Sequence, residues 1–266
     1  MPVISLTTDF GIKDGNVGVM KGVIWSIAPS VQISDLSHII QPQNIHEGAL
    51  ILARSVPYFP ENTIHLAVVD PGVGTSRRPM AARIGSQYYV GPDNGLITLL
   101  LEKAQAAGWL TEFVDLNNPQ YWLPEVSFVF HGRDIFSPVA AHLSIGVDLK
   151  SLGTPFDTPV RLEFPKPKKT ERGWRGEVIH IDHFGNVSSN IRAEQLEEAL
   201  KEKSKITVRV GEVEIKGLVN TFGERPAGEL IALMGSTGNL IVSVVNGSTA
   251  RRLNIQIGDP VEATIE

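Results

Sequence analysis

Three groups of polar residues in the first half of the sequence have residue types and positions suited to chemistry on a small ligand. Each lies at the end of an apolar run, and the groups are residues 7–11 (TTDFG), 70–78 (DPGVGTSRR) and 130–134 (FHGRD). In open α/β sheets, ligands bind outside the carboxyl ends of the strands. These groups are therefore the first candidates for a ligand-binding or catalytic site.

The ionisable residues of these groups each allow two interpretations. A carboxylate at Asp9 can accept hydrogen bonds from both hydroxyls of a ribose, or it can form a turn or cap the next helix. Asp70 and Arg77 flank a glycine-rich loop without the Gly-Lys-Ser/Thr sequence of a phosphate-binding loop, and the alternative is an ion pair that only stabilises a turn. His131 is predicted to lie at a strand end with its ring available, and a structural histidine is the alternative.

A metal site or a thiol-based site is disfavoured by the residues present. No two histidines have the His-x-x-x-His spacing of a helical metal site. The chain has no cysteine, which excludes disulfides, zinc-thiolate sites, iron–sulfur clusters and thiolate nucleophiles. We therefore expect a site that uses no metal.

Two further polar segments lie in the second half of the sequence. They are residues 181–187 (IDHFGNV) and 235–240 (GSTGNL), each between two apolar runs. Ordinary hairpin loops use the same residue types, so a turn and a ligand-binding loop are both open interpretations.

The elements that would position the first three groups follow an α/β pattern, in which short apolar runs alternate with amphipathic segments. The expected strands are residues 3–8, 31–36, 63–69, 87–90 and 112–116. The expected helices are residues 17–27, 45–58, 96–107 and 135–143, the last with Pro138 in its first turn, where proline is tolerated. This predicts a layered α/β domain with a central, mostly parallel sheet.

The second half has a different texture. Residues 154–172 contain four prolines and a basic cluster, typical of an extended connector rather than a packed element. Beyond it, one expected helix at 194–200 interrupts six expected strands, at 176–181, 205–210, 213–218, 229–233, 239–245 and 261–265. We therefore predict an α/β domain over residues 1–160, a linker over 161–173 and a smaller β-barrel domain over 174–266.

Composition narrows the class of partner. The formal net charge is −5 and no stripe of Lys or Arg is present, which disfavours a nucleic-acid partner. No apolar segment approaches the roughly 18–20 residues of a membrane span, and the first residues do not resemble a secretion signal. The sequence thus predicts a cytoplasmic protein whose partner is a small molecule.

Taken together, these segments resemble the S-adenosylmethionine hydrolase family, also called SAM hydroxide adenosyltransferases. The resemblance spans nearly the whole chain and rests on five ordered motifs: TTDFG at 7–11, DPGVGTSRRP at 70–79, GPDNG at 91–95, FHGRDIFSPVAAHL at 130–143 and HIDHFGNVSSNI at 180–191. It implies hydrolysis of S-adenosylmethionine to adenosine and methionine, with S-adenosylmethionine as the substrate and no cofactor. It also implies a homotrimer, with each active site between one subunit's N-terminal domain and a neighbour's C-terminal domain.

The resemblance assigns roles to individual residues. The family's hydrolytic triad falls on Asp70, Arg77 and His131, and Asp9 would hold the ribose hydroxyls. The remaining substrate-binding residues would be Asn186 and Phe222 for adenine, Asp182 and Ser236 for the methionine amine and carboxylate, and Phe184 and Asn246 beside them in the pocket or in purely structural roles.

Three other functions are alternatives to the hydrolysis of S-adenosylmethionine. The related fluorinases have tyrosines at the places of Asp70 and His131 and a serine at the place of Gly132, so this chain resembles the hydrolases, and a carboxylate at Asp70 would repel a halide. A non-catalytic protein that binds adenosine or S-adenosylmethionine would leave its ligand intact. A nucleoside hydrolase or phosphorylase would release free adenine.

Overall fold

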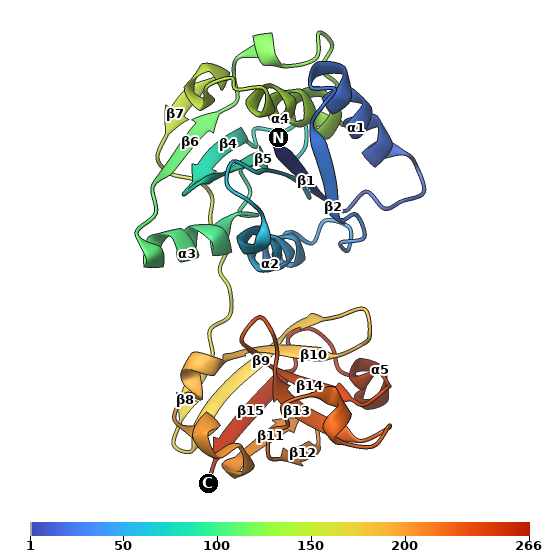
Figure 1. The fold of residues 1–266 in the computed structure, drawn as a ribbon, viewed down its shortest axis with the longest axis vertical. Helices are drawn as coiled ribbons and strands as arrows, with labels where there is room; N and C mark the ends of the chain where they lie inside the picture. The colour runs from blue at the N-terminus through green and yellow to red at the C-terminus, as the bar shows by residue number, and fades with distance from the viewer. Residues whose placement is uncertain (1) are drawn as a thin grey trace. The chain divides into compact units, whose positions relative to one another are not determined.

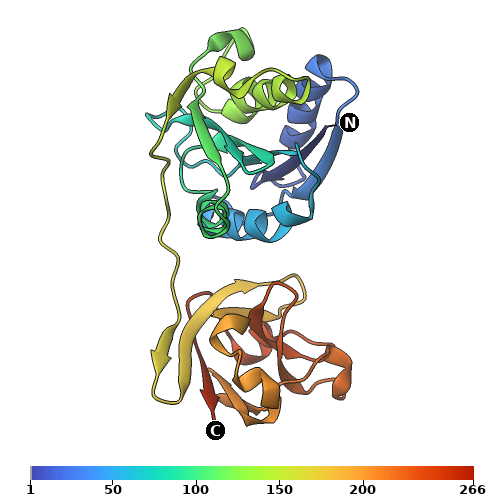
Figure 2. The same cartoon turned by 60° about the vertical axis from the view of Figure 1, so that its left-hand side comes forward.

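The computed structural model describes residues 2–266, except the side chain of Ser204, and the chain divides into two compact units. Unit 1 is Met1–Glu163 and unit 2 is Phe164–Glu266. Figures 1 and 2 show a layered α/β unit and a smaller, mainly β unit joined by an extended segment. The division falls inside the expected linker, residues 161–173.

Parts of the proline-rich segment are strands, which corrects the expectation of a connector without packed elements. β7 (Thr154–Phe156) pairs with β6 in unit 1, and β8 (Lys168–Thr170) pairs with β9 in unit 2. Both strands are short and lie at the edges of their sheets, where proline-rich flanks are tolerated because no second neighbour needs the missing N–H.

Unit 1 contains a mixed seven-stranded sheet in the order β2-β1-β3-β5-β4-β6-β7. The first three neighbouring pairs are parallel and the last three are antiparallel, so the expected parallel arrangement holds for half of the sheet. The other strand bounds are β1 (Val3–Thr8), β2 (Gln32–Ser37), β3 (Ile64–Val68), β4 (Pro79–Ile84), β5 (Gln87–Pro92) and β6 (Thr111–Asp115).

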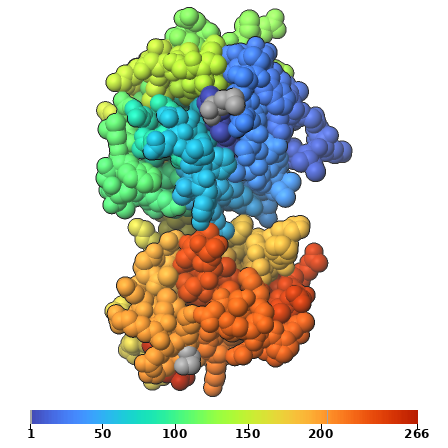
Figure 3. Space-filling model, viewed as in Figure 1, coloured from blue at the N-terminus to red at the C-terminus, as the bar shows by residue number. Residues whose placement is uncertain are grey.

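Helices cover both faces of this sheet. α1 (Asn16–Ile27) and α4 (Ser137–Ser144) pack against each other on one face, where their surfaces lie side by side in Figure 3. α2 (Ile45–Ser55) and α3 (Thr98–Ala107) cover the opposite face (Figure 1). Every residue of β3 is buried because the strand is covered on both faces, which explains why all its residues except His65 are apolar.

Unit 2 is an eight-stranded, nearly closed barrel. Its strands run in the order β12-β11-β15-β9-β10-β14-β13, the two end strands lie against each other, and β8 adds to β9. The bounds are β9 (Gly173–Ile181), β10 (Val187–Arg192), β11 (Ile206–Val210), β12 (Val213–Lys216), β13 (Leu230–Met234), β14 (Asn239–Val244) and β15 (Pro260–Ile265), with a short α5 (Thr249–Leu253). The fold class expected from the sequence is thus confirmed.

Two expected elements of the chain have a different conformation. The helix expected at 194–200 is replaced by two 3₁₀ turns, Ala193–Gln195 and Ala199–Lys205, because Leu196 after the first turn and Glu202 within the second leave the helical conformation. The expected helix at 45–58 ends at Ser55, and Val56–Tyr58 forms a 3₁₀ turn with Pro57. Proline cannot continue an α-helix, since it lacks the N–H for the backbone hydrogen bond.

A buried histidine in the sheet predicts acid sensitivity of unit 1. His65 on β3 is 2% exposed, its Nδ1 lies 2.7 Å from Ser5 Oγ on β1, and burial lowers its pKa from 6.5 to about 4. Below pH 6.5 the His65 side chain binds a proton in the unfolded chain but not in the folded chain. The free energy of unfolding therefore falls as the pH drops toward 4. We expect a loss of about 3 kcal/mol across this window.

The check is urea unfolding of the wild type and of His65→Asn between pH 7.5 and 4.5. Asparagine keeps an acceptor near the place of Nδ1 but does not titrate, so the stability gap between the two proteins should narrow as the pH falls. A gap that stays constant with pH would contradict the assignment.

Candidate active site

The carboxyl ends of β1 and β3 bring two of the predicted site residues to one edge of the sheet. The strands are parallel neighbours, and Thr8 pairs directly with Val68. Asp9 follows Thr8, and Asp70 comes two residues after Val68. The register of two adjacent buried strands therefore places both carboxylates at the sheet edge where α/β folds bind ligands.

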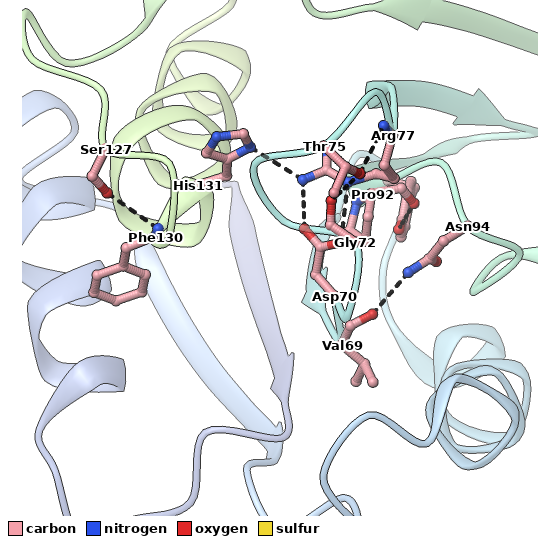
Figure 4. Close-up of polar contacts among 11 residues, drawn as sticks. Val69, Asp70, Gly72, Thr75, Arg77, Pro92, Asn94, Ser127, Phe130 and His131 are labelled. Carbon is pink, nitrogen blue, oxygen red and sulfur yellow. Dashed lines mark hydrogen bonds and ion pairs between the residues drawn. The ribbon is translucent and has the colours of Figure 1, made fainter.

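Asp70, Arg77 and His131 form one hydrogen-bonded chain at this edge (Figure 4). Arg77 Nε donates to Asp70 Oδ1 at 3.0 Å, and Arg77 NH2 donates to Asp70 Oδ2 at 2.5 Å. The same NH2 lies 3.1 Å from His131 Nδ1. The ion pair is almost completely buried, with side-chain exposures of 4% for Asp70 and 7% for Arg77, unlike a solvated surface pair.

The glycine-rich loop between Asp70 and Arg77 is shaped so that the two side chains can meet. Thr75 donates through its N–H and its hydroxyl to Gly72 O and accepts from Arg77 N–H. Gly74 has φ +74°, and a Cβ there would lie 2.1 Å from the carbonyl oxygen of Phe128. Only glycine fits at this position, because any side chain would displace the segment that precedes His131.

The sequence-based placement of His131 at a strand end is wrong. Residues 126–130 form no strand, and Phe128 and Val129 are largely exposed despite their apolar side chains. His131 instead precedes a turn of π-helix, Gly132–Phe136, which leads into α4. Single turns of π-helix are rare and are frequently found at functional sites.

Asp134 anchors the segment that carries His131. Its side chain is fully buried and accepts hydrogen bonds from the N–H and hydroxyl of Ser127 and from Arg133. Burial raises the pKa of Asp134, but the hydrogen bonds from Arg133 and Ser127 outweigh it and hold the pKa below its usual value. Ser127 in turn accepts from Phe130 N–H (Figure 4), so a fixed loop leads into His131.

Burial shifts the pKa values of Asp70 and His131 in opposite directions. Burial raises the pKa of Asp70 above its usual value, although the charge and hydrogen bonds of Arg77 act in the opposite direction. Burial also lowers the pKa of His131, and the Arg77 charge lowers it further. His131 is therefore neutral at neutral pH, and Asp70 is a more basic carboxylate than an exposed aspartate.

The hydrogen bonds also fix the tautomer of His131. A guanidinium can only donate, so His131 Nδ1 must accept from Arg77 and the single ring proton must lie on Nε2. In this state the imidazole presents a donor, not an acceptor, to anything bound beside it. Asp70 keeps unused acceptor capacity, since its two oxygens accept two bonds from Arg77 and one from the N–H of Gly72.

Asp9 has one oxygen engaged by the protein. Its Oδ2 accepts from the N–H of Gln43 at 2.7 Å, and Gln43 adopts a left-handed conformation with φ 67°. Such a backbone conformation is costly for a residue other than glycine and is held by its surroundings.

The other predicted binding residues belong to unit 2. Asp182 Oδ1 accepts from the N–H groups of Phe184 and Asn186, and Asp182 Oδ2 accepts from the Asn186 side chain at 2.8 Å. Asn186 Oδ1 accepts from Ser243, a residue that the sequence did not single out. Phe184 and Phe222 are exposed, Ser236 lies in the turn between β13 and β14, and Asn246 has φ 53° just after β14.

The GPDNG motif braces the site in a way that sequence reasoning missed. Asn94 donates to Val69 O at 2.8 Å, directly before Asp70 (Figure 4). Asp93 is buried, accepts from Val160 N–H and pairs with Arg78 at 3.3 Å. The signal available in the sequence was an Asp-Asn pair within a turn motif beside a strand end, where such side chains hold neighbouring backbone.

Within residues 2–266, no group of three His, Asp or Glu side chains is arranged as a metal-binding cluster, and no helix is long and apolar enough to cross a bilayer. The absence of a required metal or cofactor stays a prediction. What the arrangement offers is a buried carboxylate, a fixed cation and a neutral imidazole donor at one sheet edge. This set can orient a water molecule and accept a proton from it.

Comparison with known proteins supports the resemblance seen in the motifs. Residues 4–153 match the SAM hydroxide adenosyltransferase N-terminal domain, and residues 176–262 match the C-terminal domain. An (R)-S-adenosyl-L-methionine hydrolase of Salinispora tropica is 41% identical over 99% of this chain and 98% of its own, and a fluorinase of Nocardia brasiliensis is 30% identical over 99% and 97%. A crystal structure of an uncharacterized conserved protein from Thermotoga maritima superposes with a TM-score of 0.91, 36% identity and coverage of 99% of this chain and 100% of that one. The chain therefore belongs to the SAM hydroxide adenosyltransferase family.

Proposed function

We propose that this protein hydrolyses S-adenosyl-L-methionine to adenosine and L-methionine through attack of water at the ribose C5′. The observation that carries the proposal is the buried chain of Asp70, Arg77 and His131 at the carboxyl edge of the sheet. Two relatives that match 99% of this chain and are named (R)-S-adenosyl-L-methionine hydrolase support it.

The reaction needs help at the nucleophile and not at the leaving group. The water oxygen forms a bond to C5′, the C5′–S bond breaks, and its electron pair neutralises the sulfonium as the methionine thioether. The leaving group therefore needs no proton, whereas bulk water has a pKa of about 15.7 and must lose a proton as it attacks. The protein has to supply an acceptor for this proton and a fixed position for the water.

The geometry favours Asp70 as that acceptor. His131 Nδ1 already accepts from Arg77, and a second positive charge beside the guanidinium would be unfavourable. Asp70 has unused acceptor capacity and a raised pKa, so it accepts a proton more readily than an exposed aspartate does. Arg77 NH1 is buried without a protein partner among the described residues, and such a donor is normally satisfied by water or a ligand. His131 Nε2–H supplies a second donor.

The test is incubation of the purified protein with S-adenosylmethionine in H₂18O, with a chelator and without halide, followed by chromatography and mass spectrometry. We expect adenosine labelled at the 5′ oxygen, together with methionine. No adenosine above a heat-killed control would refute the proposal and leave the non-catalytic binding protein, and free adenine would indicate cleavage of the nucleoside bond.

Halide transfer is the related activity that the same experiment separates. Added chloride or fluoride would give a 5′-halo product in a halogenase. The buried carboxylate of Asp70 argues against a bound halide at this place, because two like charges a few ångströms apart repel strongly in a low-dielectric site.

We also propose that the active protein is a homotrimer whose sites combine residues of two subunits. The residues for water attack and the ribose are in unit 1, whereas those predicted to bind adenine and methionine are in unit 2. A site closed by a second subunit would exclude bulk solvent and fix the attack geometry, a contribution that reaches about 7–11 kcal/mol in favourable intramolecular cases. A cytoplasmic location stays a prediction.

Mixing two inactive variants tests whether each active site combines residues of two subunits. Asp70→Ala removes the proton acceptor, and Phe222→Glu places a charge in the predicted adenine site at an exposed position that does not disturb the core. If sites combine two subunits, unfolding and refolding the two variants together should restore part of the activity, because some sites then contain neither substitution. Refolded trimers without activity, or a fully active wild-type monomer in sedimentation, would contradict the proposal.

A further inference from the structure

The turn that carries Asp9 is held by a network of side chains that the proposed reaction does not use. Thr8 Oγ1 lies 2.9 Å from His38 Nδ1, and His38 Nε2 lies 3.0 Å from Asp35 Oδ1. Lys21 on α1 donates to the other oxygen of Asp35 at 2.6 Å. Thr8 is fully buried and His38 is 8% exposed, so this network leads from the surface to the end of β1.

The chemistry of the partners orders the donors along the network. Burial raises the pKa of Asp35, but Lys21 and His38 outweigh this and lower it, so the carboxylate is ionised and can only accept. His38 Nε2–H therefore donates to Asp35, and when the ring carries only this proton, Nδ1 accepts from the Thr8 hydroxyl. Thr8 Oγ1 in turn accepts from the N–H of Phe10 at 3.2 Å.

The segment after β2 and the turn after β1 are joined at three points. Besides the Thr8–His38 bond, Gly11 N–H donates to His38 O at 2.7 Å, and Gln43 N–H donates to Asp9 Oδ2. The contact at Thr8 precedes Asp9 in the chain, and the contact at Gly11 follows it, and both are made with His38. The contacts with His38 and Gln43 therefore fix the position of Asp9 Oδ1.

We propose that His38 and Thr8 are positioning residues for ribose binding: the relay from Asp35 through His38 to Thr8 holds the 8–11 turn so that Asp9 presents Oδ1 to the ribose hydroxyls. The proposal rests on the proposed function for the identity of the substrate. Phe10 lies on the same turn and packs edge-on against Phe130, with ring centroids 5.7 Å apart, directly beside His131. The relay thus positions Asp9, which is proposed to bind the ribose, beside the segment of His131, which is proposed to orient the water.

Two pairs of substitutions separate the bonds of the relay. Thr8→Val removes the hydroxyl at nearly constant shape, whereas Thr8→Ser keeps it. His38→Asn places an acceptor at the position of Nδ1 and keeps the Thr8 bond, whereas His38→Gln keeps a donor at the position of Nε2 and loses the Thr8 bond. The readouts are the Kd for adenosine by calorimetry, and KM and kcat for S-adenosylmethionine.

We expect Thr8→Val and His38→Gln to raise the Kd for adenosine and the KM about tenfold with a smaller change in kcat, as for one misplaced hydrogen bond. Thr8→Ser should remain near the wild type, and His38→Asn, which keeps the Thr8 bond but loses the Asp35 bond, should be affected less than His38→Gln. With 2′,3′-dideoxyadenosine, which lacks the ribose hydroxyls, Thr8→Val should bind no worse than the wild type. A purely structural role would weaken both ligands equally.

β1 offers a matched control for general loosening of the strand. Ser5 Oγ lies 2.7 Å from His65 Nδ1, a second buried hydroxyl–imidazole pair on the same strand but remote from its carboxyl end. Ser5→Ala should lower the unfolding temperature without changing the Kd. An unchanged Kd in Thr8→Val, or an equal rise in Ser5→Ala, would overturn the proposal. If the wild type binds adenosine but does not hydrolyse S-adenosylmethionine, only the proposed function is refuted. The Kd values of the variants for adenosine would still decide whether the relay positions Asp9.

Discussion

Asp70→Asn should lower kcat by about 10²–10⁴-fold while KM for S-adenosylmethionine changes little. The amide keeps an acceptor for Arg77 but cannot take up the proton that water loses during attack. In the wild type, kcat/KM should fall on the acid side as Asp70 becomes protonated, with an apparent pKa above that of an exposed aspartate, because burial raises it. This acid limb should disappear from the residual activity of the variant.

Asp93→Asn is the control that distinguishes a lost base from a lost ion pair. Asp93 is as buried as Asp70 and also pairs with an arginine, Arg78, but lies outside the triad. We expect both variants to lose stability in urea unfolding, and only Asp70→Asn to lose turnover in single-turnover assays. A kcat within a few-fold of the wild type in Asp70→Asn would show that another group accepts the proton.

The parts of the site that the sequence could predict are those that depend on strands buried on both faces. Such strands are nearly continuous apolar runs, and the polar residue that ends each run marks the sheet edge. Asp9 and Asp70 were located in this way, and the parallel pairing of β1 with β3 brings them to the same edge. Their roles in binding and proton transfer stay predictions.

The segment before His131 shows why apolar composition alone was not enough. The run at 126–130 has the residue types of a strand, yet it pairs with no sheet strand in the described structure. Its conformation is set by buried Asp134, which holds Ser127, and by the close approach of Gly74 to Phe128 O. These are contacts between residues far apart in the chain or between side chain and backbone, and no periodicity encodes them.

The relay at β1 was missed for a related reason. Thr8 belongs to the TTDFG motif at residues 7–11, but His38 lies 30 residues away in a segment without a motif of its own. Only the parallel pairing of β1 with β2 brings the ends of the two strands together. Spacing in the sequence can therefore indicate which strand ends carry chemistry, whereas the groups that hold them in place follow from the order of the strands in the sheet.

Arg77→Lys should be almost as damaging as the loss of Asp70, although the charge is retained. The guanidinium makes two bonds to Asp70 and one to His131 from a single planar group, and a lysine ammonium on a flexible stem cannot reproduce this geometry. We expect kcat to fall about 10²–10³-fold, as when a preorganised donor is removed from an active site. The unfolding free energy should drop by up to about 3–5 kcal/mol if Asp70 is left without a partner.

The neighbouring Arg78 provides the matched comparison for this substitution. Arg78 pairs with Asp93 and lies over the Phe156 ring at 4.0 Å, but it is 36% exposed and has no place in the triad. Arg78→Lys should cost little stability and leave kcat near the wild type. If Arg77→Lys retains wild-type turnover, the charge alone is sufficient, and the fixed donors to Asp70 and His131 do not orient the water. A large loss in Arg77→Lys with none in Arg78→Lys would instead show that the planar geometry of the guanidinium is what the reaction requires.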